Sequence, residues 1–196
     1  MFGKRKKRLI RKRYGALLII VGIFYFGPTI NGGFALTEHA AARYSAPNSE
    51  GEVVYEKKFG DKKVIIWDTG KQKFLKVIDN WGILHRVTNI DGINPFAEDG
   101  MKTNWSATQQ EKKQHYKTVF SVEVTNENIV TVIVTNADLN NKGTSLEEVK
   151  EQSTIHVEMD VTNGYAAHYD TLPYSAVGNF VFRGLNKKGE VIAVSD

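Results

Sequence analysis

Alternating apolar and polar residues run through most of the chain after residue 52, and this period of two predicts β-strands. Four such segments fill residues 52–90 at a spacing of about ten residues, separated by turn signals at Gly60-Asp61, Thr69-Gly70 and Asp79-Asn80. Strands with this spacing pair with their neighbours, so we expect a four-stranded antiparallel meander. The second segment, KKVIIWD, is apolar on both faces, as is typical of a central strand.

A second group of strand-like segments, within residues 115–196, predicts an antiparallel and sandwich-like β region of about six strands. YKTVFSVEVTN and IVTVIVTN are joined by a tight turn near Glu127-Asn128, and TIHVEMDV is joined to YAAHYD by Asn163-Gly164. Asn-Gly is a strong hairpin signal because a type I′ turn needs two positive φ angles. A last hairpin turns at residues 186–189, and a capping-box pattern at Ser145 predicts a short helix over residues 146–152.

Two further segments complete the expected mainly β, α+β fold. Residues 36–46 predict a short helix with Thr37 as its N-cap. Residues 91–114 are rich in Gly, Pro, Asn and Asp and predict a linker or long loop, which would separate two domains. The expected organisation is a basic tail (1–13), a membrane helix (14–30), a short helix with a meander (36–90), the linker (91–114) and an antiparallel β domain (115–196).

The N-terminal segment combines a basic block with an apolar run. A retained signal-anchor is expected, and its 17 residues from Tyr14 to Ile30 would extend roughly 26 Å as a helix. The positive block should stay cytoplasmic, which places the remainder outside as a single-pass protein. Cleavage at Gly33-Phe34-Ala35 and secretion is the open alternative. The orienting residues are Lys4, Arg5, Lys6, Lys7, Arg8, Arg11, Lys12 and Arg13; the membrane residues are Tyr14, Leu17, Leu18, Ile19, Ile20, Val21, Ile23, Phe24 and Phe26.

Charge and cysteine content narrow the class of function. The net charge is +4, but the first 35 residues hold eight of the 26 Lys and Arg residues and none of the 22 Asp and Glu residues, so the remainder carries −4. A mildly acidic outer region argues against nucleic-acid binding. The chain has no cysteine, which excludes disulfides and thiolate metal sites. No cofactor is expected.

One cluster of residues has the chemistry of a metal site. His156, Glu158 and Asp160 share one face of a predicted strand, while Ile155, Val157, Met159 and Val161 share the other. His and carboxylate side chains together can bind zinc or a harder divalent ion. The alternation alone also predicts a solvated strand face, which is the interpretation that we prefer. A simple Asn163-Gly164 hairpin places His168 and Asp170 away from Glu158, whereas a one-residue bulge would reverse this.

Aromatic residues gather in and after the first β region and form a second candidate site. Exposed aromatics beside carboxylates can make a glycan or peptide groove, whereas aromatics in strands usually belong to the core. The aromatic residues are Trp67, Trp81, Trp105, Phe74 and Phe96, and the nearby carboxylates are Asp61, Asp68, Asp79 and Asp91. Ser106 and Ser145 lack a Gly-x-Ser-x-Gly context, so no hydrolase triad is indicated.

The overall layout resembles that of the many uncharacterised membrane-anchored extracytoplasmic proteins of Gram-positive bacteria. The residues that carry this resemblance are KRKKRLIRKRYGALLIIVG, FGDKKVIIWDTGK and FRGLNKKGEVI. It implies a place in the cell envelope and supplies no catalytic motif. We therefore expect a non-catalytic binding module whose partners are the membrane and an envelope protein or cell-wall polymer. The alternatives are a secreted metal-dependent hydrolase using His156, Glu158 and Asp160, and an accessory subunit of a membrane complex. The oligomeric state is left open.

Overall fold

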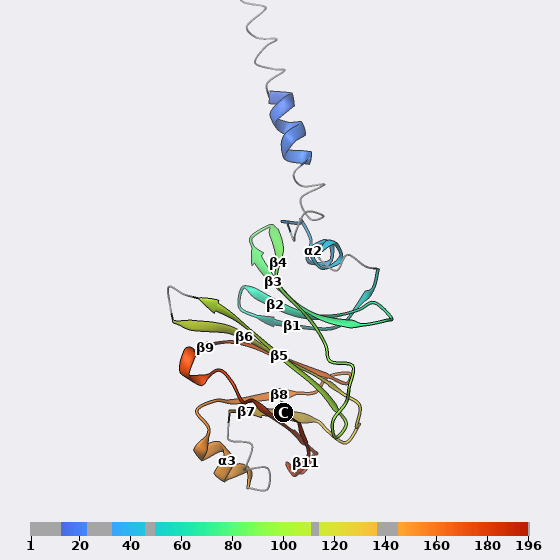
Figure 1. The fold of residues 1–196 in the computed structure, drawn as a ribbon. Coiled ribbons are helices and arrows are strands. Elements are labelled where there is room, and N and C mark those ends of the chain that lie inside the picture. The colour runs from blue at the N-terminus through green and yellow to red at the C-terminus, as the bar shows by residue number, and fades with distance from the viewer. Residues whose placement is uncertain (1–12, 23–32, 46–49, 111–113, 137–144, 196) are drawn as a thin grey trace, which may run out of the picture.

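The protein is a stack of three antiparallel β-sheets with a short helix on its outermost face (Figure 1). The computed structural model describes residues 13–22, 33–45, 50–110, 114–136 and 145–195. The fold is mainly β, as expected. Helix α2 (Glu38–Tyr44) begins at Thr37, whose side chain accepts a hydrogen bond from the Ala40 amide, so the predicted N-cap is confirmed.

The first sheet is the expected four-stranded meander. It consists of β1 (Glu52–Phe59), β2 (Lys62–Asp68), β3 (Lys73–Trp81) and β4 (Leu84–Gly92), paired in that order. Phe59 pairs with Lys62 across a two-residue turn in which Gly60 has a φ of 59°, a conformation that glycine adopts without strain. Four successive side chains of β2 are buried because this strand is covered on both faces.

The second sheet contains β5 (Met101–Gln110), β6 (His115–Val124) and β9 (Tyr165–Pro173), with β6 in the middle. The third contains β11 (Val191–Ser195), β10 (Val181–Leu185), β7 (Thr131–Thr135) and β8 (His156–Asp160), paired in that order. Helix α3 (Leu146–Gln152) has the predicted capping box at Ser145, and a 3₁₀ turn, η4, covers Tyr174–Ala176.

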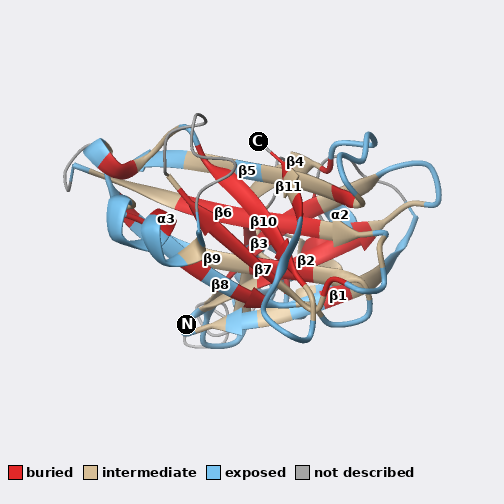
Figure 2. Ribbon diagram, turned by 90° about the horizontal axis from the view of Figure 1, so that it is seen from below, coloured by how far each residue is buried: buried red, intermediate tan, exposed pale blue. Residues whose placement is uncertain are grey.

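Three apolar clusters join these layers, and the buried parts of the strands meet through the middle of the molecule (Figure 2). Ala41 and Ala42 of α2 pack on Ile65, Trp67 and Ile78 of the first sheet. The opposite face of that sheet packs on Val119 and Ala167 of the second sheet. The other face of the second sheet packs on the third through residues that include Phe120, Val122, Val132, Val134, Met159 and Phe182. The second sheet is therefore covered on both faces.

The expected linker over residues 91–114 is wrong for about half of its length. Residues 101–110 form β5, which pairs with β6 over ten residue pairs from Met101–Val124 to Gln110–His115. The sequence MKTNWSATQQ is too polar to reveal this strand because β5 lies at an edge of its sheet and leaves much of its surface open. Its long pairing with β6, and not its own apolar pattern, holds it in place.

Two expected hairpins are instead crossings between sheets. β6 belongs to the second sheet and β7 to the third, so residues 125–130 carry the chain from one layer to the next. The same holds for β8 and β9, which belong to different sheets, and the turn between them is closed by a bridge between Thr162 and Tyr165. Asn163 and Gly164 do have the predicted positive φ angles, 52° and 80°. A tight turn thus formed as expected, but the strands that it joins diverge into facing sheets.

The N-terminal segment is described only in part. Residues 13–22 form a helix in which Leu17, Leu18, Ile19 and Ile20 are exposed. In the regions that the structure describes, no helix has the length and apolar character needed to cross a membrane. The predicted membrane residues Ile23, Phe24 and Phe26, and the orienting residues Lys4 to Lys12, lie outside the described residues.

Candidate binding cleft

A polar cleft opens between the first and second sheets. It consists of two adjoining hollows of about 600 and 60 Å³ that share the side chains of Lys117 and Tyr169. We call these two hollows together the inter-sheet cleft. The wider hollow is lined by Asp61, Lys62, Gln110, His115, Lys117, Tyr169 and Thr171. The narrower one is lined by Val77, Thr88, Asn89, Thr108, Lys117, Val119 and Tyr169.

Strand pairing explains why these side chains meet. In the second sheet Val119 pairs with Tyr169 and Lys117 pairs with Thr171. Val119 and Ala167 pack against the first sheet, and alternate residues of a strand share one face. Lys117, Tyr169 and Thr171 therefore face the first sheet as well, beyond the point where the apolar core ends.

The first sheet contributes an ion-paired cluster to the mouth of the cleft. Lys62 Nζ lies 3.0 Å from an oxygen of Asp61 and 2.8 Å from an oxygen of Asp79. The hydrogen bond from Lys62 lowers the pKa of Asp61, and Asp61 and Asp79 raise the pKa of Lys62 although burial acts in the opposite direction. Thr88 donates a hydrogen bond to the other oxygen of Asp79 at 2.9 Å. The oxygens of both carboxylates are thus engaged by Lys62, and Asp79 is also held by Thr88.

Lys117 and Tyr169 are different because they leave donor groups available inside the cleft. Lys117 is half-buried, and among the described residues no carboxylate comes within 4 Å of its ammonium group. Burial raises the pKa of Tyr169, and the charges of Asp79, Asp61 and Asp170 add to this while Lys62 opposes it. The phenol therefore remains protonated at neutral pH and can donate a hydrogen bond. An ammonium and a phenol side by side suit an anionic or hydroxyl-bearing ligand.

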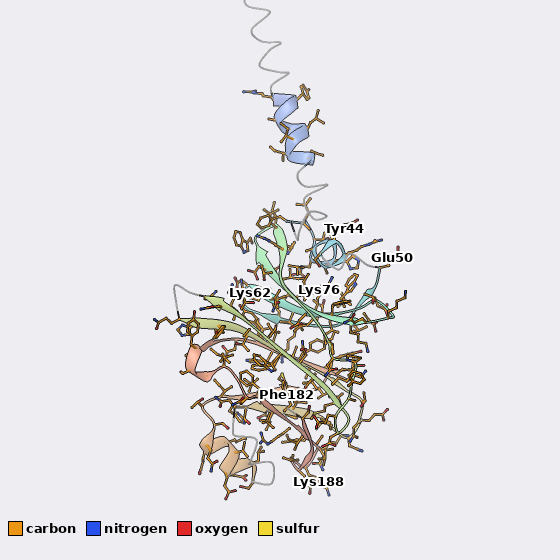
Figure 3. All side chains as sticks on the ribbon, in the orientation of Figure 1. Tyr44, Glu50, Lys62, Lys76, Phe182 and Lys188 are labelled. Carbon is orange, nitrogen blue, oxygen red and sulfur yellow. The ribbon has the colours of Figure 1, made fainter. Side chains whose placement is uncertain are left out.

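Lys62 lies where the layers of the first and second sheets approach each other (Figure 3). Around the cleft, Gln110 and Thr171 add an amide and a hydroxyl group, and His115 adds an imidazole. Asn89, deeper inside, donates a hydrogen bond to Ser106 Oγ at 2.8 Å, which ties β4 to β5 across the narrow hollow. These side chains supply a varied set of donors and acceptors on rigid strands, which is the arrangement expected of a binding site.

The predicted trio of His156, Glu158 and Asp160 lies elsewhere. All three are exposed on the outer face of the third sheet, while Val157 and Met159 between them are buried against the second sheet, so the predicted alternation is confirmed. Burial lowers the pKa of His156, with Lys150 adding to the effect and Glu158 opposing it. Within the described part of the chain, no group of three or more His, Asp and Glu residues is arranged to hold a metal ion.

His168 and Asp170 are separated from that trio because β9 belongs to a different sheet from β8. His168 Nε2 lies 4.0 Å from an oxygen of Asp170, and its ring packs edge-on against Phe59 with centroids 5.5 Å apart. Burial lowers the pKa of His168 although Asp170 opposes this. His168 is thus kept apart from Glu158 as expected, but by the layer structure and not by the two faces of one hairpin.

The candidate aromatic residues do not converge on one groove. Trp67 is buried beneath α2, and Trp105 packs on Phe180 with ring centroids 5.0 Å apart. Trp81 is the last residue of β3 and is 63% exposed, whereas Phe96, beyond the far end of β4, is 79% exposed. The core interpretation therefore holds for Trp67, while Trp81 and Phe96 are separate surface residues.

Sequence reasoning did not single out Lys117, Tyr169 or Thr171. Their strands were predicted, but the side that the three residues face becomes meaningful only when the second sheet is known to be covered on both faces. The available signal was that Lys117 shares a face of its strand with Val119, which is an unusual position for a lysine if that face is covered. From the sequence alone, Lys117 could equally have been a solvent-exposed lysine. Only the packing of the first sheet on β6 and β9 shows that it faces a cleft.

A separate open groove of about 610 Å³, apart from the inter-sheet cleft, follows the edge strand β1. It is lined by residues 53–57 together with Asp160, Thr162 and Asn163. Burial raises the pKa of Tyr55, which lies at its base, and the Asp160 charge adds to this while a hydrogen bond with the Ala167 backbone opposes it. Charged residues such as Lys57 and Lys58 on an edge strand oppose pairing with another chain. We therefore base the functional proposal on the inter-sheet cleft.

Comparison of the chain with protein-family models, with curated proteins and with solved structures found no match. The geometry of the cleft and the charge pattern of the N-terminal segment are therefore the features of the molecule that bear on function.

Proposed function

We propose that the protein is an extracytoplasmic, non-catalytic binding module anchored to the cell membrane by residues 14–30, and that its inter-sheet cleft binds an anionic, hydroxyl-bearing polymer of the cell wall. The observation that carries the binding proposal is that Lys117 and Tyr169 both line the two hollows, at their junction. The ammonium group matches a phosphate or carboxylate, and the phenol with Thr171 matches neighbouring hydroxyl groups.

The cleft favours binding over catalysis because the carboxylates at its mouth, Asp61 and Asp79, both form ion pairs with Lys62. A general acid needs a carboxyl group with a raised pKa, commonly through burial away from cations. Asp61 instead has a lowered pKa because Lys62 donates a hydrogen bond to it, and Asp79 shares the same lysine. Asp61 therefore lacks the environment of a proton donor at neutral pH, and the oxygens of Asp79 are held by Lys62 and Thr88.

The membrane part of the proposal is supported by charge. Eight Lys and Arg residues directly precede an apolar run, and the positive side of such a segment stays in the cytoplasm. Protease added to intact protoplasts should therefore remove the β-sheet region of the protein. If that region survives in intact protoplasts and is cut only after lysis, the orientation is wrong.

The binding part is tested with polyglycerol phosphate as the probe and the full chain in detergent micelles. Isothermal titration should give a Kd that rises about tenfold or more in Lys117→Gln, because one charge-assisted hydrogen bond contributes about 1.5–3 kcal/mol. Tyr169→Phe should weaken binding less. Lys188→Gln is the matched control, because Lys188 is an exposed lysine outside the cleft, and it should bind like the unmodified protein. Equal affinity of Lys117→Gln and the unmodified protein would overturn the assignment of the cleft.

A further inference from the structure

A group of exposed apolar side chains lies around the turn between β3 and β4, and the proposed binding function does not use them. Trp81 is 63% exposed, Ile83 is 76% exposed and Leu36 is 58% exposed. Phe34 packs beside Trp81, with ring centroids 5.6 Å apart. We call Phe34, Leu36, Trp81 and Ile83 the hairpin-tip patch.

Backbone pairing fixes this patch at the point where the N-terminal segment joins the folded region. The amide and carbonyl groups of Ala35 and His85 exchange two hydrogen bonds, both of 2.8 Å. Antiparallel pairing at that point sets Leu36 beside Leu84 and Phe34 beside Arg86, whose guanidinium lies 5.7 Å from the centre of the Phe34 ring. The hairpin tip and the incoming chain therefore form one rigid surface.

The short connection between residues 30 and 35 limits how far the hairpin-tip patch can lie from the N-terminal apolar run. Five residue steps separate Ile30, the end of the apolar run, from Ala35. Even fully extended, they span at most about 18 Å. If residues 14–30 cross a membrane, Ala35 lies within that distance of the end of the membrane helix. The hairpin-tip patch, fixed to Ala35, is then held against the same membrane surface.

The chemistry of the patch suits that location. The Trp ring is favoured at the boundary between lipid headgroups and acyl chains, and Phe, Ile and Leu side chains favour the apolar layer beneath. Arg86 and Arg43 are exposed on β4 and α2, where they can meet lipid phosphate groups. Figure 1 shows the β3–β4 turn beside α2, at the opposite end of the stack from β11.

We propose that the hairpin-tip patch inserts into the outer headgroup region of the bilayer, so that the protein holds its sheets in a fixed orientation on the membrane. The inference rests on the membrane anchoring in the proposed function. It adds a second, shallow contact that the folded region itself makes with lipid. The inter-sheet cleft then keeps a constant height and direction above the membrane.

The test uses the absence of native cysteine, which makes any introduced cysteine a unique labelling site. A nitroxide is attached to Ile83→Cys in the full chain, reconstituted in vesicles of phosphatidylcholine and phosphatidylglycerol. Electron paramagnetic resonance then measures collisions with oxygen, which concentrates in lipid, and with a water-soluble nickel chelate. Phe96→Cys is the matched control, because Phe96 is an equally exposed apolar residue beyond the far end of β4. Lys188→Cys is a second control outside the patch.

We expect the label at residue 83 to collide with the nickel chelate several-fold less often, and with oxygen more often, than the labels at residues 96 and 188. Equal nickel accessibility at residues 83 and 96 in vesicles that carry the protein overturns the inference and leaves the anchor intact. Spin–spin broadening at residue 83 that disappears on dilution with unlabelled protein identifies a second copy as the occupant and also overturns it. A protein that fails to float with the vesicles overturns the anchoring itself.

Discussion

The ammonium group of Lys76 donates hydrogen bonds to the carbonyl oxygen of Ala42 at 2.6 Å and to Ser45 Oγ at 3.0 Å. Lys76 lies in the middle of β3 and has no exposed surface. Its charge meets the last turn of α2, where the helix dipole favours a cation, and lies 5.3 Å from the centre of the Trp67 ring. This one side chain fastens α2 to the first sheet, and burial lowers its pKa to about 8.

The first prediction concerns the pH dependence of stability that follows from Lys76. The folded-state pKa is below the ordinary value of 10.5, so between pH 8 and 10.5 the unfolded chain binds more protons than the folded one. Stability then rises with pH in that window, by about 1 kcal/mol between pH 8 and pH 9. Urea unfolding at the two pH values should show this rise for the unmodified protein.

Lys76→Met should abolish the rise, because the buried titrating group is gone. Lys188→Met, which removes an exposed lysine, should keep it. The measurement stops at pH 9 because burial raises the pKa of Tyr55 and Tyr169 above the ordinary value of 10.0. These phenols ionise in the unfolded chain increasingly above pH 9, which would oppose the effect. A rise of the same size in Lys76→Met would show that Lys76 is not the group responsible for the pH dependence of stability.

A second prediction concerns the independence of the folded region. All three apolar clusters lie within residues 35–193, so a fragment of residues 33–196 should fold without the N-terminal segment. Circular dichroism should show a β-dominated spectrum and a cooperative thermal transition. A fragment that begins at residue 36 should be less stable, because it lacks Ala35 and its two hydrogen bonds to His85. A structureless spectrum for the longer fragment would refute the prediction.

A third prediction tests the packing of the second sheet on the third. Phe120 is fully buried between them, and its ring lies 4.8 Å from that of Phe180 and 6.2 Å from that of Phe182. Phe120→Ala should lower the free energy of unfolding by about 3–5 kcal/mol, because it leaves a cavity that rigid strands cannot fill. Phe96→Ala changes the same side chain at an exposed site and should stay within about 0.5 kcal/mol. Similar losses in both variants would mean that the two sheets do not pack as described.

The fourth prediction concerns the exposed face of β8. Glu158→Gln should change the free energy of unfolding by less than about 0.5 kcal/mol, as is usual for a surface substitution. Zinc or manganese should not raise the melting temperature of the protein in a way that depends on Glu158. A ligand that binds only the native state stabilises it, so a rise that vanishes in both Glu158→Gln and His156→Ala would reveal a metal site after all.

The sequence predicted individual strands better than their assembly. The meander over residues 52–90 was predictable because each strand pairs with its neighbour in the chain and the turn at Gly60 has the right chemistry. The course of the chain from β6 to β7 and from β8 to β9 was not predictable. The alternation of apolar and polar residues identifies the apolar face of a strand, but it does not indicate which sheet packs on that face. Val157 and Met159 have the same pattern whether β8 pairs with β9 or faces it.

The candidate cleft was beyond sequence reasoning for the same physical reason. Lys117 and Asp61 are 56 positions apart in the chain, and they line one hollow only because the first sheet stacks on the second. The polar strand β5, which contributes Gln110 and Thr108, was hidden by its weak apolar pattern. The trio in β8 was visible because its residues are neighbours on one strand, and the exposure of its face was predictable from the alternation alone.

Because β9 lies in the middle sheet, one face of the first sheet cannot be fully covered during synthesis until β9 has been made. Val64, Ile66, Leu75 and Val77 are made early, but the side chains that cover them include Ala167 of β9. A chain that emerges N-terminus first must therefore leave this face of the meander open to water, or to a chaperone, until β9 has emerged. A chain that stalls before residue 165 would present a preformed apolar surface with its cover missing, which makes it prone to aggregation and to proteolysis.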